Sequence, residues 1–422
     1  MASDRRRLLG NMASLFTLQG ANYALPLVTL PYLVRVLGPE KFGLIAFAQA
    51  FIQYFVVATD YGFNLSATRD VAIHREDPQK LAEIIAAVMT IKIILALAGA
   101  IVLAFLVWLV PTFRQHWMLY SVVYLTVLGA TLFPTWLFQG LERMRDITWM
   151  NVGARLTTTA CIFIFVQAPS DFVTAGAIQS APVALAAIPA WAVLRRSHHV
   201  QLRLPRLAII YEQLKNGWHV FLSTAAINVY TSSNTFVLGL IAGPAAVGYF
   251  SAANKLIQAV QGLLTPITQA LYPHISALVV RSRAEALTFI RKILKWIVPI
   301  AFALSGLVLS AAGPLVTLIL GSQYGPSISV LAWLAFLPFI IALSNVFGIQ
   351  TMLTFGMNQL FSRILIASAG LNLLLIVPLA WRFGADGAAI SMLCTEIFVT
   401  TSMAWMLHRR GINLYLPLRE VA

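Results

Sequence analysis

The chain consists largely of long apolar segments, each of a length that can cross the hydrocarbon core of a membrane. Most have about 20–27 residues, and about 20 apolar residues in an α-helix span a bilayer. In lipid the backbone must satisfy its hydrogen bonds within the segment, which favours helices. We therefore expect an all-α integral membrane protein with about twelve transmembrane helices, at approximately residues 11–34, 43–64, 82–109, 117–138, 149–168, 173–194, 219–241, 249–272, 296–320, 327–353, 362–382 and 387–407.

The amino-acid composition excludes a soluble globular domain. Hydrophobic residues make up 59% of the 422 residues and charged residues only 10%, whereas about a quarter of a soluble protein is charged. The two cysteines, Cys161 and Cys394, fall in separate apolar segments, with neither disulfide nor metal-ligand spacing. We expect both to be small buried hydrophobic residues, and the sequence predicts no metal site and no cofactor.

The distribution of positive charge predicts how the chain is oriented. Most of its 29 Lys and Arg residues lie in the even-numbered turns and in the two tails, which is the positive-inside pattern, so both termini are expected in the cytoplasm. Loops that face anionic headgroups also explain the net charge of +14, which therefore does not indicate nucleic-acid binding. Arg5-Arg6-Arg7 precedes an apolar stretch too long for a signal peptide, so we expect that stretch to remain as the first helix.

Short matches between the two halves of the chain indicate an internal repeat. The matching pairs are 37–43 with 242–248, and 190–196 with 404–410. Six helices per half preserve the orientation, so the halves are expected to be parallel repeats about an axis along the membrane normal. We expect an N-terminal lobe at 1–208 and a C-terminal lobe at 209–422 around a central cavity, which is the architecture of an alternating-access carrier.

The sequence lacks the motifs of the enzymes that work at membranes. It has no G-x-x-x-x-G-K-[ST] phosphate loop for nucleotide hydrolysis and no H-E-x-x-H zinc motif. A nucleophile elbow is also missing, and the outward turns are too short to form a catalytic domain. We therefore expect a protein that is not an enzyme.

Several polar and charged residues lie within or at the edges of the apolar segments. At the bilayer centre a charge costs roughly 2.5–3.5 kcal/mol on insertion scales, so each needs a partner, water or a function. The ionisable ones are Arg35, Asp60, Lys92, Arg155, Lys255 and Glu396. The excess of cations suits an anionic cargo. We predict a substrate-binding set that consists of the cations Lys255, Arg155 and Lys92 and the polar residues Asn22, Gln53 and Asn228.

Depth in the membrane, at about 1.5 Å per helical residue, also predicts two ion pairs. Asp60 and Arg155 are expected at similar depth, and so are Lys255 and Glu396. Such pairs are the structural alternative to substrate binding, since they would lock helices together. Lys92 is then left without an obvious acidic partner. Asp60 and Glu396 are predicted either to lock helices or to carry a coupling proton, with a pKa raised by burial.

One region of the sequence resembles a known transporter family. Residues 38–50, Gly-Pro-Glu-Lys-Phe-Gly-Leu-Ile-Ala-Phe-Ala-Gln-Ala, and the following Asp60-Tyr61-Gly62-Phe63 are similar to Wzx-type flippases of polysaccharide (O-antigen) repeat units. The likeness continues at 64–70, 252–256 and 384–390 and covers essentially the whole chain. The superfamily of this family also holds multidrug and toxic-compound extruders and the lipid II flippases.

The resemblance implies a twelve-helix carrier in the bacterial inner membrane. Its cargo would be an undecaprenyl-diphosphate-linked oligosaccharide, moved from the cytoplasmic to the periplasmic leaflet for lipopolysaccharide or another polysaccharide. Its partners would be membrane lipids, a polysaccharide polymerase and a chain-length regulator. A drug–cation antiporter of the same fold is the alternative, which acidic rather than cationic lumen residues would favour. A membrane glycosyltransferase would need the large outward loops that are missing here.

Overall fold

The computed structural model describes residues 2–198 and 205–414; the side chains of 2–24, of 195–198 and of some positions between 219 and 270 lie outside this description. The described part consists of helices and short turns, without a strand, as the all-α prediction requires. The helices up to the middle of the chain are α1 (Ala2–Asp60), α2 (Ser66–Ile73), α3 (Pro78–Leu109), α4 (Pro111–Gln115), α5 (Trp117–Val123), α6 (Leu125–Leu132), α7 (Thr135–Gly140), α8 (Met144–Phe165), η1 (Pro169–Asp171), α9 (Phe172–Ser180), α10 (Pro182–His198) and α11 (Leu207–Arg281).

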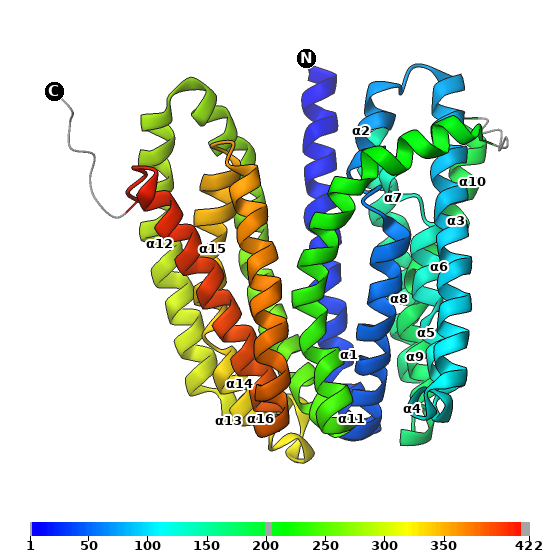
Figure 1. Cartoon of the computed structure of the whole chain (residues 1–422), viewed down its shortest axis with the longest axis vertical. Coiled ribbons are helices and arrows are strands. Elements are labelled where there is room, and N and C mark those ends of the chain that lie inside the picture. The colour runs from blue at the N-terminus through cyan, green and yellow to red at the C-terminus, as the bar shows by residue number, and fades with distance from the viewer. Residues whose placement is uncertain (1, 199–204, 415–422) are drawn as a thin grey trace. The chain divides into compact units, whose positions relative to one another are not determined.

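The remaining helices follow the same pattern of long segments joined by short turns (Figure 1). They are α12 (Arg283–Ser310), α13 (Ala312–Leu315), η2 (Val316–Leu320), η3 (Ser322–Tyr324), α14 (Ser327–Leu334), α15 (Leu337–Asn345), η4 (Val346–Leu353) and α16 (Asn358–Arg409). Two of the short elements, η2 and η4, are π-helical, so the predicted spans at 296–320 and 327–353 are not regular α-helices throughout.

Three of the longest helices are interrupted at a glycine in a non-helical conformation. The glycines are Gly38 (φ 70, ψ 171), Gly243 (φ 81, ψ 177) and Gly384 (φ 55, ψ −126). Figure 1 shows α1 and α16 turning back on themselves, so each contains two of the predicted segments. Gly38 and Gly243 are the matching glycines of the predicted repeat, and they have nearly the same backbone angles. The two halves of the chain therefore share this local backbone conformation, and the repeat itself stays a prediction.

Eight helical stretches among the described residues are long and apolar enough to cross a membrane. They are Leu25–Asp60, Pro78–Leu109, Trp117–Gly140, Pro169–Leu194, Thr231–Leu263, Arg283–Ser310, Ser327–Leu353 and Asn358–Arg409. Several of these stretches reverse direction at a glycine or are broken into shorter helices, so one stretch can contain more than one membrane crossing. The integral membrane class is confirmed, and the number of twelve crossings stays a prediction.

The chain divides into two compact units, Met1–Ser232 and Ser233–Ala422. The first part of α11 belongs with the first unit because it packs closely on the turn after α1. There the ring of Tyr61 stacks on Phe221 at 5.0 Å between centroids, and Gln213 Nε2 donates to Asp70 Oδ2 at 3.0 Å. The lobes predicted at 1–208 and 209–422 describe the sequence repeat, and that boundary remains a prediction.

Each unit has its own hydrophobic core and leaves other apolar side chains exposed. In the first unit, Trp136, Phe138 and Phe63 are fully buried, and in the second unit Phe347 and Met403 are buried among aliphatic residues. On α3 the opposite face carries exposed apolar residues, including Ile94, Leu97, Ile101, Phe105 and Trp108. An apolar exterior of this kind is stable in lipid and not in water.

Candidate functional site

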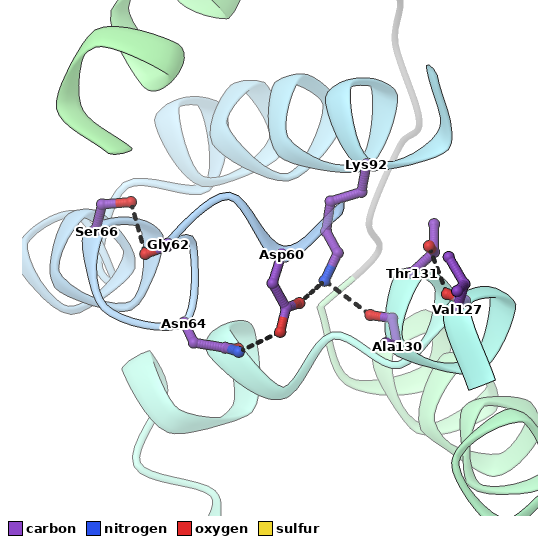
Figure 2. Close-up of polar contacts among 8 residues, drawn as sticks. All are labelled: Asp60, Gly62, Asn64, Ser66, Lys92, Val127, Ala130 and Thr131. Atoms are coloured by element: carbon purple, nitrogen blue, oxygen red, sulfur yellow. Dashed lines mark hydrogen bonds and ion pairs between the residues drawn. The ribbon is translucent and has the colours of Figure 1, made fainter. Parts of the chain in front are cut away.

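A buried ion pair between Lys92 and Asp60 joins three helices of the first unit (Figure 2). Lys92 Nζ donates to Asp60 Oδ1 at 2.8 Å and to the carbonyl oxygen of Ala130 at 2.7 Å. Lys92 is only 1% exposed, whereas the side chain of Asp60 is 25% exposed. The pair therefore fixes the end of α1, the middle of α3 and the end of α6 to one another.

The local sequence explains why each group is available for this pair. Helix α1 ends at Asp60 because Tyr61 (φ 44) and Gly62 (φ 77) turn the chain out of the helix. The second carboxylate oxygen of Asp60 accepts from Asn64 Nδ2 at 3.0 Å. The carbonyl of Ala130 would normally accept from the N–H group four residues later, but that residue is Pro134, which has none. Lys92 thus donates to a carbonyl oxygen that has no backbone donor because residue 134 is a proline.

This geometry corrects two expectations from the sequence. Lys92 does have an acidic partner, and the predicted pair of Asp60 with Arg155 is wrong because Asp60 binds Lys92. Arg155 lies on α8 with a half-buried side chain. Its carbonyl accepts from Thr158 Oγ1, but its guanidinium forms no hydrogen bond or ion pair with any side chain or backbone group that the structure describes.

Amide side chains of the first unit form a sparse polar set. Gln53 Nε2 lies 3.4 Å from Asn228 Oδ1, and Gln49 Nε2 lies 3.4 Å from Gln179 Oε1. Hydrogen bonds of this length are weak, so these amides can exchange partners at small cost. The structure thus brings Gln53 and Asn228 together, and their binding of substrate stays a prediction. The side chain of Asn22, the third predicted polar residue, lies outside the described residues.

The second unit contains a buried polar cluster that was not predicted from the sequence. Asn372 is fully buried, and its Nδ2 lies 3.2 Å from Asn234 Oδ1, 3.3 Å from Ser391 Oγ and 3.1 Å from Thr395 Oγ1. None of these four residues belongs to the predicted substrate-binding set. The sequence does contain a signal for this cluster: Asn372 lies before the reversal at Gly384, and Ser391 and Thr395 lie after it.

Glu396 follows this cluster on α16 and is 7% exposed. Its carboxylate forms no ion pair with the described residues, so the predicted pair with Lys255 is not formed. Similar depth was the basis of that expectation, and depth does not fix how two helices are rotated about their axes. Lys255 lies on α11 with a half-buried side chain.

Comparison with known proteins shows the family of this chain. Residues 8–279 match the family described as polysaccharide biosynthesis protein. A protein of Escherichia coli (strain K12) named "Putative O-antigen transporter" is 41% identical over 403 residues, covering 96% of this chain and 97% of its own. The chain belongs to this family. A Shigella dysenteriae member with the same name is 34% identical over 93% of this chain and 98% of its own.

Solved structures with low sequence identity share the fold of this family member. The lipid II flippase MurJ in an inward closed conformation aligns with a TM-score of 0.73 at 12% identity, over 95% of this chain and 87% of that one. An inward-facing MATE multidrug resistance transporter aligns with a TM-score of 0.69 at 16% identity, over 92% and 95%. These alignments confirm the fold, and the match to the family model and the 41% identical relative confirm the family.

Proposed function

We propose that this protein flips a lipid-linked oligosaccharide from the cytoplasmic to the periplasmic leaflet of the bacterial inner membrane. The cargo is an undecaprenyl-diphosphate-linked repeat unit of O-antigen or a similar polysaccharide. The observation that carries the proposal is the 41% identity to the protein named "Putative O-antigen transporter", over 97% of its length. A polymerase and a chain-length regulator would take over the product on the periplasmic side.

The chemistry of the cargo explains why a protein is needed. Sugars and a diphosphate lose their hydrogen bonds to water in hydrocarbon, at several kcal/mol for each unsatisfied group. Amides such as Gln53 and Asn228, which are only weakly bonded to one another, offer replacement partners for sugar hydroxyls. The polyprenyl tail is itself apolar and can remain in the lipid, so it needs no specific site.

The diphosphate requires cations that are not already paired. Lys92 was predicted to bind substrate, but its ammonium group is bound to Asp60 and Ala130, so we assign Lys92 and Asp60 to locking helices instead. Arg155 is the candidate that meets this condition, and Lys255 stays a predicted candidate on its charge alone. Arg155 is favoured because its planar guanidinium can bind two phosphate oxygens at once and has no partner among the described groups.

The energy source follows from the missing nucleotide-binding motif. The membrane potential, negative inside, favours outward movement of an anion by about 2.3 kcal/mol per charge per 100 mV, and polymerisation removes the product. Glu396, a buried carboxylate without an ion pair in the described structure, is our candidate for a coupling proton. Flipping itself breaks no covalent bond, so no catalytic residue is needed.

Substitution of Arg155 tests the proposed diphosphate contact. In a strain that depends on this protein for surface polysaccharide, Arg155→Ala should lower surface polysaccharide about 10- to 100-fold, since a hydrogen bond to a charged group contributes about 1.5–3 kcal/mol. Arg155→Lys should retain part of the activity, because it keeps the charge and loses the bidentate contact. Arg281→Ala is the matched control: Arg281 is exposed and, among the residues that the structure describes, pairs with Glu285 at 3.9 Å.

The readout is surface polysaccharide on gels, normalised to the amount of inserted protein. Normal polysaccharide in the Arg155→Ala variant would contradict the assignment of this residue. A drug–cation antiporter is the second candidate, since the MATE transporters have the same fold. Efflux of cationic dyes by cells that overproduce this protein, together with normal polysaccharide in its absence, would favour that candidate.

A further inference from the structure

The end of α16 carries basic and aromatic side chains that the proposed transport does not use. The guanidinium carbon of Arg409 lies 4.0 Å from the centre of the Trp405 ring, a cation–π contact. Trp405 is 48% exposed, and His408 and Arg410 are exposed beside it. An exposed guanidinium held over an exposed indole is restrained in position and remains accessible to a ligand.

The first turns of a second helix of the same unit, α12, lie at this point. Arg291 on α12 donates through Nη2 to the carbonyl oxygen of Asn413 at 2.6 Å. The Nδ1 atom of His408 lies 2.6 Å from Asn413 Oδ1, and Leu414 is buried against the same core. Asn413 thus connects α12 with the end of α16 and gives the surface a defined shape.

Helix α12 extends the positive charge of this surface. Lys292 and Lys295 are exposed, one turn apart, and Trp296 next to them is 68% exposed. Neither 286–300 nor 397–414 contains an acidic residue. We call Arg291, Lys292, Lys295, His408, Arg409 and Arg410 the basic cluster. Its single sign of charge, at the end of apolar helices, selects an anionic partner.

An apolar path leads away from the basic cluster along α16. Ile397, Thr401 and Trp405 are exposed at intervals of four residues, so they form one stripe on the helix surface. This stripe ends at Arg409. A ligand that fits this surface has an anionic group, which would lie at the basic cluster, and a hydrocarbon chain, which would lie along the stripe.

We infer that the basic cluster, with the Ile397–Trp405 stripe, is a binding site for an anionic phospholipid. The phosphodiester would be held by Arg409 and its basic neighbours, because guanidinium groups bind phosphate oxygens in a bidentate manner. One acyl chain would lie along the stripe. Basic residues next to a membrane span attract anionic headgroups, and free inorganic phosphate would make no use of the stripe.

The opposite end of the same helical segment offers a matched control. Arg382 lies 5.5 Å from the centre of the Phe383 ring, and Trp381 beside it is 80% exposed. Here, however, Asp386 follows closely and no second basic residue lies nearby in sequence. Arg382 lies next to the reversal at Gly384, and the helical segment from there to Arg409 is about 36 Å long at 1.5 Å per residue, so the two sites can be tested independently.

The experiment measures lipid preference of the purified full-length protein by native mass spectrometry after exchange into mixed phosphatidylglycerol and phosphatidylethanolamine nanodiscs. The unmodified protein should retain phosphatidylglycerol preferentially. Arg409→Gln should reduce this preference about fivefold, the effect of one basic residue at a membrane surface, and Trp405→Leu should reduce it less. Arg382→Gln should leave it unchanged.

Equal retention of the two lipids by the unmodified protein would overturn the inference, and so would equal effects of Arg409→Gln and Arg382→Gln. Competition by inorganic phosphate as strong as that by phosphatidylglycerol would show an anion site without lipid recognition, which also contradicts it. Arg409 is exposed, so its substitution should not impair folding, and the thermal unfolding curve of each variant checks this.

Discussion

Lys92 has three ammonium hydrogens, and because it is only 1% exposed, these must be bonded within the protein. Two of the hydrogens are directed to Asp60 and to the carbonyl that Pro134 leaves open. Asp60, by contrast, is partly exposed and also accepts from Asn64. The two members of the ion pair therefore differ in how much each depends on the other.

This asymmetry predicts unequal effects of removing either partner. Asp60→Ala should lower the free energy of unfolding by about 3–5 kcal/mol, because it leaves a buried charge uncompensated. Lys92→Met should cost less, since Asp60 keeps Asn64 and some solvent. The double variant should be more stable than Asp60→Ala alone, as a coupled pair requires. Thermal unfolding in detergent measures this, and strictly additive losses would contradict the helix-locking role.

The same pair shows what the sequence could and could not predict about the site. A charge inside an apolar segment needs a partner, water or a function, and for this reason both Asp60 and Lys92 were singled out from the sequence. Their pairing was not predicted, because depth along a helix says nothing about its rotation. Pro134 was the local signal: a proline at the end of an apolar segment frees the carbonyl four residues before it.

At the level of helices, glycines determine where the long segments reverse. Gly38 and Gly243 have positive φ and ψ near 180°, a region that is essentially restricted to glycine. Their repetition in the two halves was recognised from the sequence because it is a local property of the chain. The breaks in 117–138 and 327–353 were not predicted, although each segment contains a proline, Pro134 and Pro338.

A pair of glycine substitutions tests this account of the reversals. Gly243→Ala should destabilise the protein by about 1–3 kcal/mol, although an added Cβ would meet no atom within 4 Å. Gly306→Ala in α12 also meets no atom, but it lies in a helix and should be neutral or stabilising by up to about 1 kcal/mol. Unfolding temperatures in detergent are the measurement. Equal changes in the unfolding temperature of the two variants would show that the backbone conformation of Gly243 does not make its replacement destabilising.

For the molecule as a whole, the positive-inside pattern predicts the topology. Reporter fusions after Gly38, Gly243 and Asp386 should be active in the periplasm, and fusions within 281–292 should be active in the cytoplasm. The apolar segments and the family are both read from residues along the chain, which is why the membrane class and the fold were predictable. A single clear reversal among these fusions would refute the parallel-repeat arrangement and the cytoplasmic termini.

The most direct test of the central claim is transport in liposomes that contain only this protein. An undecaprenyl-diphosphate-linked oligosaccharide is placed in one leaflet, and its arrival in the other is followed by accessibility to a glycosidase, without nucleotide. The account predicts protein-dependent transfer that is slowed by Arg155→Ala and unaffected by Arg281→Ala. Transfer no faster than in protein-free liposomes, with correctly folded protein present, would contradict it.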